Sequence, residues 1–478
     1  MANDLNCLAE CPDREHAGRV LEQAARDAAL AVRERLEEQS ASCTVCARGL
    51  QCAKCAMGPC RVDPDGPDAR PGACGANADL TVARNFGRAI AAGAAAHGDQ
   101  ARELLEALRA AGEKGTVADP EKLTALCAEL GLDHAGLDVA GQVRALLRLF
   151  FDNFGTCAEA LTFVSRAPAA RRAVWEHSGT TPRGVDRECV AMLRRTTLGD
   201  AADPAVLCRQ ALRTALADGW GAAMIGTAVA DILSGTPQPT RVELAADAVT
   251  VTTGYSIEAI FEAMGGSLDP LIKAFRIGMV RGVVGVIACE ACGDWRDGEL
   301  VELVRELVAQ DILVLAMGGG PVPLGRAGLL DPAGTEQAGS GLADFCDHLD
   351  LPPVLHVDGD LDHARFLELC AQLADTFGVD MAALPVAVSV PEGGSEKTLA
   401  AGLCAVASGL STHLGCTPNI LGGPGVAHWA LHGLEDAVGA AFVLQPDPVR
   451  AVEAISRQIT VKRLALGLND RFDGTVYS

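Results

Sequence analysis

The run "VVGVIA" at residues 283–288 is the first of several short, apolar, β-branched segments in the second half of the chain. Four more follow: "DILVLAM" at 311–317, "PPVLHV" at 352–357, "LPVAVSV" at 384–390 and "AAFVL" at 440–444. Segments with helical spacing of apolar residues separate these runs, and such alternation predicts a parallel sheet with crossover helices. We therefore predict a Rossmann-like α/β domain over residues 249–478.

The first half of the chain has the pattern of helices and almost no convincing strand. Apolar residues recur at helical spacing from Arg14 to Glu38, and again after Cys74 in "ADLTVARNFGRAIAAGAAAHGDQARELLEALRAA". The pattern continues to about Leu244, with a break at "GTPQPT" (235–240) caused by two prolines and a glycine. These features predict a helical domain over residues 1–248, and an α + α/β fold for the whole chain.

Composition narrows the class of partner. The 478 residues carry a formal charge of −22 and are 49% hydrophobic. Nucleic acids and anionic membranes bind positive surfaces, so the charge argues against both and favours a small molecule or a redox protein. The N-terminus lacks a basic stretch followed by an apolar one, and no apolar run approaches the ~20 residues that span a bilayer. We expect a soluble, cytoplasmic protein with no membrane insertion.

Eighteen cysteines, in a chain too large to need disulfides and without an export signal, indicate metal or redox chemistry. Cys52, Cys55, Cys60 and Cys74 have the spacing C-x2-C-x4-C-x13-C. Four thiolates from one glycine-containing loop are typical of a [4Fe-4S] cluster. A structural zinc site uses the same ligands and is the alternative, although zinc sites more often contain two paired C-x2-C knuckles.

Cys43 and Cys46 form a separate C-x2-C pair just upstream. Two thiolates cannot complete a cubane, so a cluster at this pair needs a second pair of ligands from elsewhere, most simply from a second copy across a two-fold axis. The alternative is that they are two ordinary thiols.

A further group of candidate ligands follows the predicted strands. Ligands of open α/β sheets bind beyond the carboxyl ends of the strands. Cys289 and Cys292 form a C-x2-C pair there, and Asp358 and Asp360 follow another predicted strand. This group predicts either an altered metal site or a redox dithiol, with a chance pairing as the alternative. The isolated cysteines in apolar helical contexts are expected to be core thiols: Cys127, Cys157, Cys189, Cys208, Cys346, Cys370 and Cys404.

Several motifs together resemble one family of proteins. They include "CAKCAMGPCRVDP", "GACGANADLTVARNFGRAIAAGAAAH", "GVDRECVAMLRRTTLG", "ALADGWGAAMIGTAVADILSGTPQPTR", "GYSIEAIFEAMGGSLDPLIKAFRIGMVRGVVGV", "PPVLH", "SEK" and "KRLALGL". The chain resembles the anaerobic nickel-iron carbon monoxide dehydrogenases and, more distantly, the hybrid-cluster proteins. These motifs cover nearly every part of the chain.

The resemblance implies specific roles for the cysteines. Cys52, Cys55, Cys60 and Cys74 would hold an intrachain [4Fe-4S] cluster that relays electrons. Cys43 stands where the family places a ligand of a cluster shared between two subunits, and Gln51 occupies the position of its usual partner, so Cys46 would take over that role. The family pattern therefore implies a homodimer with an inter-subunit [2Fe-2S] or [4Fe-4S] cluster, and a ferredoxin-like or other electron-transfer partner.

The same comparison indicates losses at the family's nickel–iron–sulfur centre. The resemblance implies that a middle α/β domain of roughly 100 to 200 residues, including a histidine ligand, is missing between "TRVELAADAVT" and "VTTGYSIEAI". Of the C-terminal ligands only Cys289 matches, because Gly319 and Asp360 stand where the family has cysteines. Such a cluster needs thiolates, so the ligand count argues against bound nickel.

Two isolated matches to the family's catalytic residues remain. Lys397 in "SEK" matches a lysine that stabilises a bound intermediate by charge, and His97 matches the first of a helical series of proton-shuttling histidines. The next two members of that series are Gln100 and Glu103 here. A solvated lysine and a partly buried structural histidine are the alternatives.

Three functional hypotheses follow. The first is a shortened family member that keeps the electron-relay clusters and transfers electrons or reduces another small molecule. The second is an active carbon monoxide dehydrogenase, converting CO and water to CO2, two electrons and two protons at an unusual site. The third is a non-enzymatic redox sensor or docking subunit. Intact relay ligands beside substituted active-site ligands favour the first.

Overall fold

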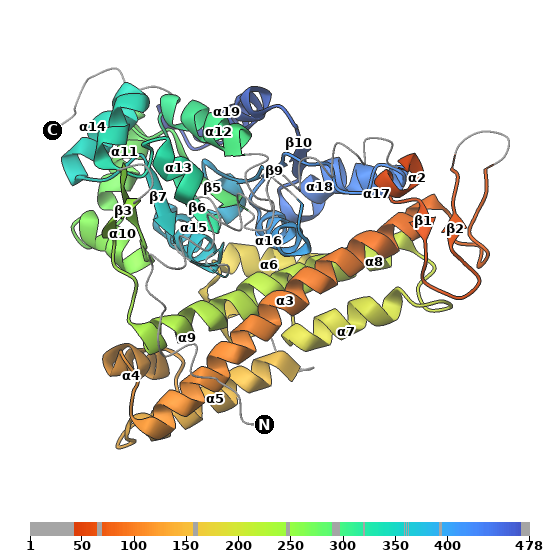
Figure 1. Cartoon of the computed structure of the whole chain (residues 1–478), viewed down its shortest axis with the longest axis horizontal. Helices are drawn as coiled ribbons and strands as arrows, with labels where there is room; N and C mark the ends of the chain where they lie inside the picture. The colour runs from red at the N-terminus through yellow and green to blue at the C-terminus, as the bar shows by residue number, and fades with distance from the viewer. Residues whose placement is uncertain are drawn as a thin grey trace.

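The computed structural model describes residues 43–469, except 65–68, 156–160, 245–248, 289–296, 319–320, 358, 360, 362 and 392–393. Long helices lie side by side below a sheet that carries its own helices, and a small cysteine-rich segment lies at one end (Figure 1). The predicted helix at Arg14–Glu38 falls outside the described residues.

The cysteine-rich segment and the long helices come from the first half of the chain. The segment contains α2 (Thr44–Ala47) and the two-residue strands β1 (Gln51–Cys52) and β2 (Cys60–Arg61). The helices are α3 (Ala78–Lys114), α4 (Pro120–Glu129), α5 (Val139–Gly155), η3 (Thr162–Arg166), α6 (Ala169–Ser178), α7 (Val185–Arg195), α8 (Pro204–Ala217), η4 (Asp218–Ala223) and α9 (Met224–Ser234). The predicted long helix after Cys74 is α3, which starts where the Asn77 side chain accepts a hydrogen bond from the Leu80 backbone N–H at 2.9 Å.

Helix α8, the π-helical η4 and α9 form one continuous helical stretch. Within the described residues, this stretch, Pro204–Ser234, is the one candidate membrane span by length and composition, yet 83% of its apolar window is buried inside the protein. It therefore has the character of a core helix, whose apolar surface packs against other helices.

The sheet of the second half has eight strands: β3 (Thr240–Leu244), β4 (Val249–Thr253), β5 (Gly282–Ala288), β6 (Ile312–Gly318), β7 (Val354–Val357), β8 (Val386–Val390), β9 (Thr412–Leu414) and β10 (Phe442–Leu444). Their order is β10-β9-β8-β5-β6-β7-β4-β3, and every neighbouring pair except β3 and β4 is parallel. From β5 to β10 this is the doubly wound order 3-2-1-4-5-6. The five predicted strands and the parallel sheet are confirmed.

The remaining helices lie between strands of the sheet along the chain, except α19, which follows the last strand. They are α10 (Ile257–Ala263), α11 (Asp269–Ile277), α12 (Asp297–Ala309), α13 (Pro321–Arg326), η6 (Pro332–Gln337), α14 (Ser340–Leu349), α15 (His363–Phe377), η7 (Met381–Ala383), α16 (Glu396–Ala407), α17 (Pro424–His428), η8 (Trp429–Gly433), α18 (Leu434–Val438) and α19 (Pro448–Ala465). Helices α15 and α16 face the long helices of the first half (Figure 1).

The two halves of the chain are closely packed. One hydrophobic core contains side chains from both, such as Leu105 of α3 and Val314 of β6. Helices α3 and α16 approach so closely that a Cβ on Gly93 would lie 2.1 Å from the carbonyl oxygen of Glu396. The β3–β4 pair was not predicted, and the predicted boundary at residue 248 lies between these two antiparallel strands.

Candidate functional site

The four cysteines of the predicted cluster lie in a small hairpin and in the segment that follows it. Strands β1 and β2 pair antiparallel, with Cys52 opposite Cys60. The chain turns at Gly58, whose N–H donates to the carbonyl of Cys55 at 3.1 Å. A Cβ on Gly58 would lie 3.0 Å from the carbonyl oxygen of Cys52, so this tight turn favours glycine. Cys52 is buried, Cys55 and Cys60 are half-buried and Cys74 is exposed.

Hydrogen-bond donors point at two of these sulfur atoms. The Ala73 N–H donates to Cys60 Sγ at 3.4 Å, and Arg84 Nη1 lies 3.9 Å from Cys74 Sγ. Hydrogen bonding from the Ala76 backbone, aided by the Arg84 guanidinium, lowers the pKa of Cys74 below its ordinary value. Soft thiolates supported by N–H donors fit an iron–sulfur cluster, since hydrogen bonds to the sulfurs help set its potential.

The upstream pair, Cys43 and Cys46, lies on the protein surface. Cys43 caps the short helix α2, and both thiols are exposed. A hydrogen bond from the backbone of Cys46 lowers the pKa of Cys43, while the hydrogen bond between the two thiols raises the pKa of Cys46. Cys46 Sγ also lies 3.4 Å from Gln51 Oε1. Two adjacent surface thiols, one with a lowered pKa, are accessible and suited to bind a soft metal ion.

Contacts with both halves of the protein hold the cysteine segment in place. The Asn85 side-chain amide of α3 donates to the carbonyl oxygens of Gly49 and Gln51, both at 2.9 Å. The Gly422 N–H donates to the carbonyl of Arg48 at 2.8 Å. The cysteine segment and α17 lie together at one end of the molecule (Figure 1).

A second group of functional side chains is buried between the two halves. His97 of α3, Asp218 of η4 and His363 of α15 have 2%, 0% and 5% of their surface exposed. His97 Nδ1 lies 2.9 Å and 3.0 Å from the two carboxylate oxygens of Asp218. The rings of His97 and His363 are 5.2 Å apart. His97 is therefore more deeply buried than the partly buried histidine considered from sequence.

Asp218 starts the π-helical segment that interrupts the continuous α8–α9 stretch. Such segments widen a helix locally and occur often at functional sites. A Cβ on the following residue, Gly219, would lie 2.3 Å from Cys404 Sγ of α16, so the wide turn packs directly on the second half. Burial, followed by the charge on Asp218, raises the pKa of the nearby Cys189 thiol to about 12.

The other predicted site residues have mixed outcomes. Lys397 is half-buried in the first turn of α16, just beyond the carboxyl end of β8. Cys289 and Cys292 lie outside the described residues, as do Asp358, Asp360 and Gly319. The predicted core thiols that the structure describes are all buried: Cys127, Cys189, Cys208, Cys346, Cys370 and Cys404. Cys157 is outside the described part.

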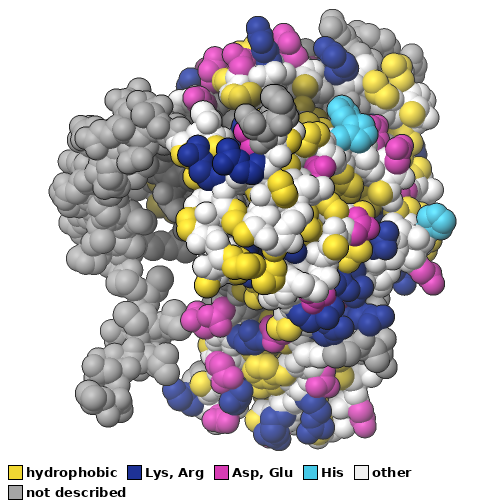
Figure 2. Space-filling model, turned by 90° about the vertical axis from the view of Figure 1, so that its right-hand side faces the viewer, with side chains coloured by type: hydrophobic (Ala, Val, Ile, Leu, Met, Phe, Trp, Pro, Cys, Tyr) yellow, Lys and Arg dark blue, Asp and Glu magenta, His cyan; other side chains and the backbone are white. Residues whose placement is uncertain are grey.

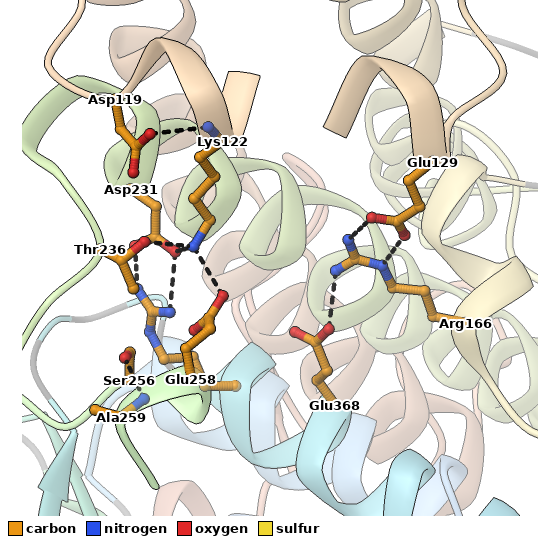
Figure 3. Close-up of polar contacts among 11 residues, drawn as sticks. Asp119, Lys122, Glu129, Arg166, Asp231, Thr236, Ser256, Glu258, Ala259 and Glu368 are labelled. Carbon is orange, nitrogen blue, oxygen red and sulfur yellow. Dashed lines mark hydrogen bonds and ion pairs between the residues drawn. The ribbon is translucent and has the colours of Figure 1, made fainter. Parts of the chain in front are cut away.

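A cavity of about 550 Å³ lies among α4, α9, α10 and α15, and sequence reasoning did not find it. Lys122 Nζ donates to Asp231, Thr236 and Glu258 at 2.6, 2.8 and 2.9 Å (Figure 3). Although burial opposes it, the Lys122 hydrogen bond lowers the pKa of Glu258.

The same cavity contains a second set of ion pairs. Arg166 binds both Glu129 and Glu368 on the other side of the view in Figure 3. Burial raises the pKa of Glu368 despite this arginine. These ion pairs join the two halves of the chain, so the charged residues that line the cavity have a structural role.

A family model described as the Prismane/CO dehydrogenase family matches residues 50–252 and 242–449. The chain belongs to this family of iron–sulfur proteins. Carbon monoxide dehydrogenase 1 of Methanosarcina mazei is 30% identical over 612 aligned positions, which cover 94% of this chain and 97% of that protein. Carbon monoxide dehydrogenase 2 of Carboxydothermus hydrogenoformans is 27% identical, with coverage of 94% and 97%.

Solved structures of the family show the same fold. A nickel-free carbon monoxide dehydrogenase from Thermococcus sp. AM4 superposes with a TM-score of 0.87 at 31% identity, covering 91% of this chain and 94% of that one. Carbon monoxide dehydrogenase IV of Carboxydothermus hydrogenoformans superposes with a TM-score of 0.86 at 27% identity, covering 94% and 99%.

The alignments also show that this family member is short. The M. mazei alignment has 612 positions, whereas 94% of 478 residues is about 449, so about 160 positions of that relative have no counterpart here. The two family matches meet at residues 242–252.

Proposed function

We propose that this protein is an electron-transfer member of its family, in which Cys52, Cys55, Cys60 and Cys74 hold one [4Fe-4S] cluster. The observation that carries this proposal is the hairpin that places Cys52 opposite Cys60, with N–H and guanidinium donors directed at Cys60 and Cys74. The cluster would take up and release single electrons. The protein would hold it by the four thiolates and stabilise their charge with the Ala73 N–H and Arg84.

Cys43 and Cys46 would hold half of a second cluster, completed by the same pair of a second subunit. Their exposure supports this arrangement, because ligands of a shared cluster must reach the subunit surface. Figure 2 shows hydrophobic side chains gathered on the face of the molecule that carries the cysteine segment. Exposed apolar residues of this segment and its neighbours include Met57, Val190, Leu193, Leu198 and Leu421. A homodimer would bury such a surface.

The proposal excludes the family's nickel-dependent reaction. The shorter length and the meeting of the family matches at residues 242–252 support loss of a middle domain between β3 and β4, two strands that only four residues of sequence separate. Together with the substitutions at Gly319 and Asp360, this loss leaves too few thiolates for a nickel–iron–sulfur centre. An external redox protein, such as a ferredoxin, would exchange electrons with the cluster.

Metal analysis of anaerobically purified protein tests the proposal. We expect about four irons per chain from the cubane and about one or two more from a half-share of a bridging cluster, with no nickel. Reduction should give the EPR signal of a cubane, and CO should not reduce a viologen dye. Nickel at about one per chain with CO-dependent dye reduction would instead establish an active carbon monoxide dehydrogenase.

Two cysteine variants separate the two clusters. Cys52→Ser should remove about four irons and the cubane signal, while Cys43→Ser should remove only about one or two irons and convert the dimer to monomer. Cys127→Ala is the matched control, because this buried thiol of α4 lies at the opposite end of the long helices. Unchanged iron in Cys52→Ser would refute the cubane assignment, and unchanged iron in Cys43→Ser would refute the bridging one.

A further inference from the structure

His97, Asp218 and His363 form a compact group of metal-ligand side chains. Each can offer one ligand atom such that the three atoms lie within 4.8 Å of one another. Among the residues that the structure describes, this is the one group of three or more His, Cys, Asp or Glu side chains that meets that distance. The three residues are separated widely in sequence and come from three helical elements, α3, η4 and α15.

The burial of this group needs an electrostatic explanation. A carboxylate with none of its surface exposed is costly to place in a protein interior unless a positive group balances it. His97 Nδ1 contacts both oxygens of Asp218, so a hydrogen bond from this imidazole offsets part of that cost. A divalent cation bound by the carboxylate and both imidazoles would supply it more completely, because buried charges are commonly paired or coordinate metals.

The surrounding backbone holds the ligands firmly. Asp218 lies on the π-helical turn, and Gly219 next to it packs on Cys404 and Leu367 with no room for a side chain. His363 is the first residue of α15, which follows β7, so it lies at the carboxyl edge of the sheet. Open α/β sheets bind their ligands at this edge.

We propose that His97, Asp218 and His363 bind one divalent transition-metal ion of the Co(II) or Zn(II) class. Two imidazole nitrogens and one carboxylate oxygen suit these ions, whereas Mg²⁺ and Ca²⁺ prefer shells of oxygen. Three protein ligands leave further coordination positions open for water or a small molecule. The site is independent of the proposed iron–sulfur clusters, which bind through the cysteine segment at the end of the molecule.

Zinc binding to the full-length protein with its iron–sulfur content intact tests the site. Equilibrium dialysis should retain about one zinc per chain, and X-ray absorption should show nitrogen and oxygen ligands at about 2.0–2.2 Å. Zinc held instead by the cysteine segment would show sulfur at about 2.3 Å. A sulfur shell, or no retained zinc, in the wild-type protein would overturn the proposal even if no variant folds.

Variants identify the ligands. His363→Phe keeps the ring volume but removes both nitrogens, and we expect it to weaken zinc binding by at least about 100-fold, since even the partners that orient a ligand are worth 10–100-fold. Asp218→Asn should weaken binding similarly. The matched control is His428→Gln/His432→Gln, which removes an exposed histidine pair with rings 5.4 Å apart that is also able to bind zinc.

The control variant should retain the wild-type zinc affinity. Wild-type affinity in His363→Phe, or loss of zinc in the His428→Gln/His432→Gln control, would refute the assignment. Iron content is measured in every variant and should not change. If the wild-type protein binds no zinc but has the expected iron content, the zinc proposal is wrong and the proposed electron-transfer function stands. If the wild-type protein binds zinc but lacks iron, the zinc proposal stands and the electron-transfer function is wrong.

Discussion

Replacing Arg171 with methionine tests how the helical half is joined to the α/β half. Arg171 lies on α6 with none of its surface exposed. Its Nε donates to Asp380 Oδ1 at 2.9 Å, its Nη2 contacts the other carboxylate oxygen, and its Nη1 donates to the carbonyl of Val438 at 2.6 Å. Methionine preserves much of the apolar stem but leaves these acceptors without their donor.

The expected loss of stability follows from burial. Breaking a buried ion pair from one side costs about 3–5 kcal/mol. Because the Asp380 side chain is 25% exposed and can be rehydrated, we expect the lower end, about 3 kcal/mol. At about 2.1 cal/mol/K per residue, 478 residues have an unfolding entropy of about 1 kcal/mol/K. The melting temperature should therefore fall by about 3 °C if the chain unfolds as one unit.

Differential scanning calorimetry of the anaerobic protein measures this change. The matched control is Arg241→Met, which removes an ion pair with Asp331 whose arginine side chain is 64% exposed. Exposed pairs contribute about 0–1 kcal/mol, so the control should melt within about 1 °C of wild type. If Arg171→Met melts no lower than Arg241→Met, the buried pair does not join the two halves in the way described.

Three further predictions concern single residues. Burial lowers the pKa of Lys462 from 10.5 to about 8, so between these pH values the unfolded state binds more protons than the folded state, and the stability of the protein rises with pH. Lys462→Met should lose this rise when melting temperatures are measured at pH 7.5 and 9.5. An equal rise in melting temperature for the variant and the wild type would contradict the prediction. Gly219→Ala should lower the free energy of unfolding by about 1–3 kcal/mol in denaturant experiments, because its Cβ would lie 2.3 Å from Cys404 Sγ. The control Gly298→Ala on α12, with no atom within 4 Å of its Cβ, should not destabilise the protein. Equal losses in the two variants would refute the packing argument. Arg84→Gln removes a cation beside Cys74 and should raise the pKa of this thiol, although the Ala76 hydrogen bond, the larger cause of the lowered pKa, remains. The pH dependence of Cys74 alkylation in iron-free protein measures the rise. An unchanged pKa would show that Arg84 does not contribute to lowering it.

Much of the α/β half was predictable because its signals are local. A buried parallel strand is a short apolar run, and the five runs from "VVGVIA" to "AAFVL" all became strands of the sheet. Strands β3 and β4 were missed because polar residues interrupt them. Strand β3 (TRVEL) contains Arg241 and Glu243, and β4 (VTVTT) alternates valine with threonine, so neither is a continuous apolar run. The cysteine segment was recognisable from spacing, since all four proposed ligands lie within residues 52–74.

The buried group between the two halves was not predictable from spacing. His97 is a lone match to a family pattern, but its hydrogen-bond partner Asp218 lies 121 residues away, and nothing in the sequence around either one indicates their contact. His363 gave no signal either, because a single histidine at a helix start is common. The sequence by itself determined the local helices and strands and the cysteine segment, because each of these depends on the pattern of residues that are close together in the sequence. Only the tertiary structure placed a carboxylate and two imidazoles together, because that contact depends on how α3, the π-helical turn and α15 pack against one another.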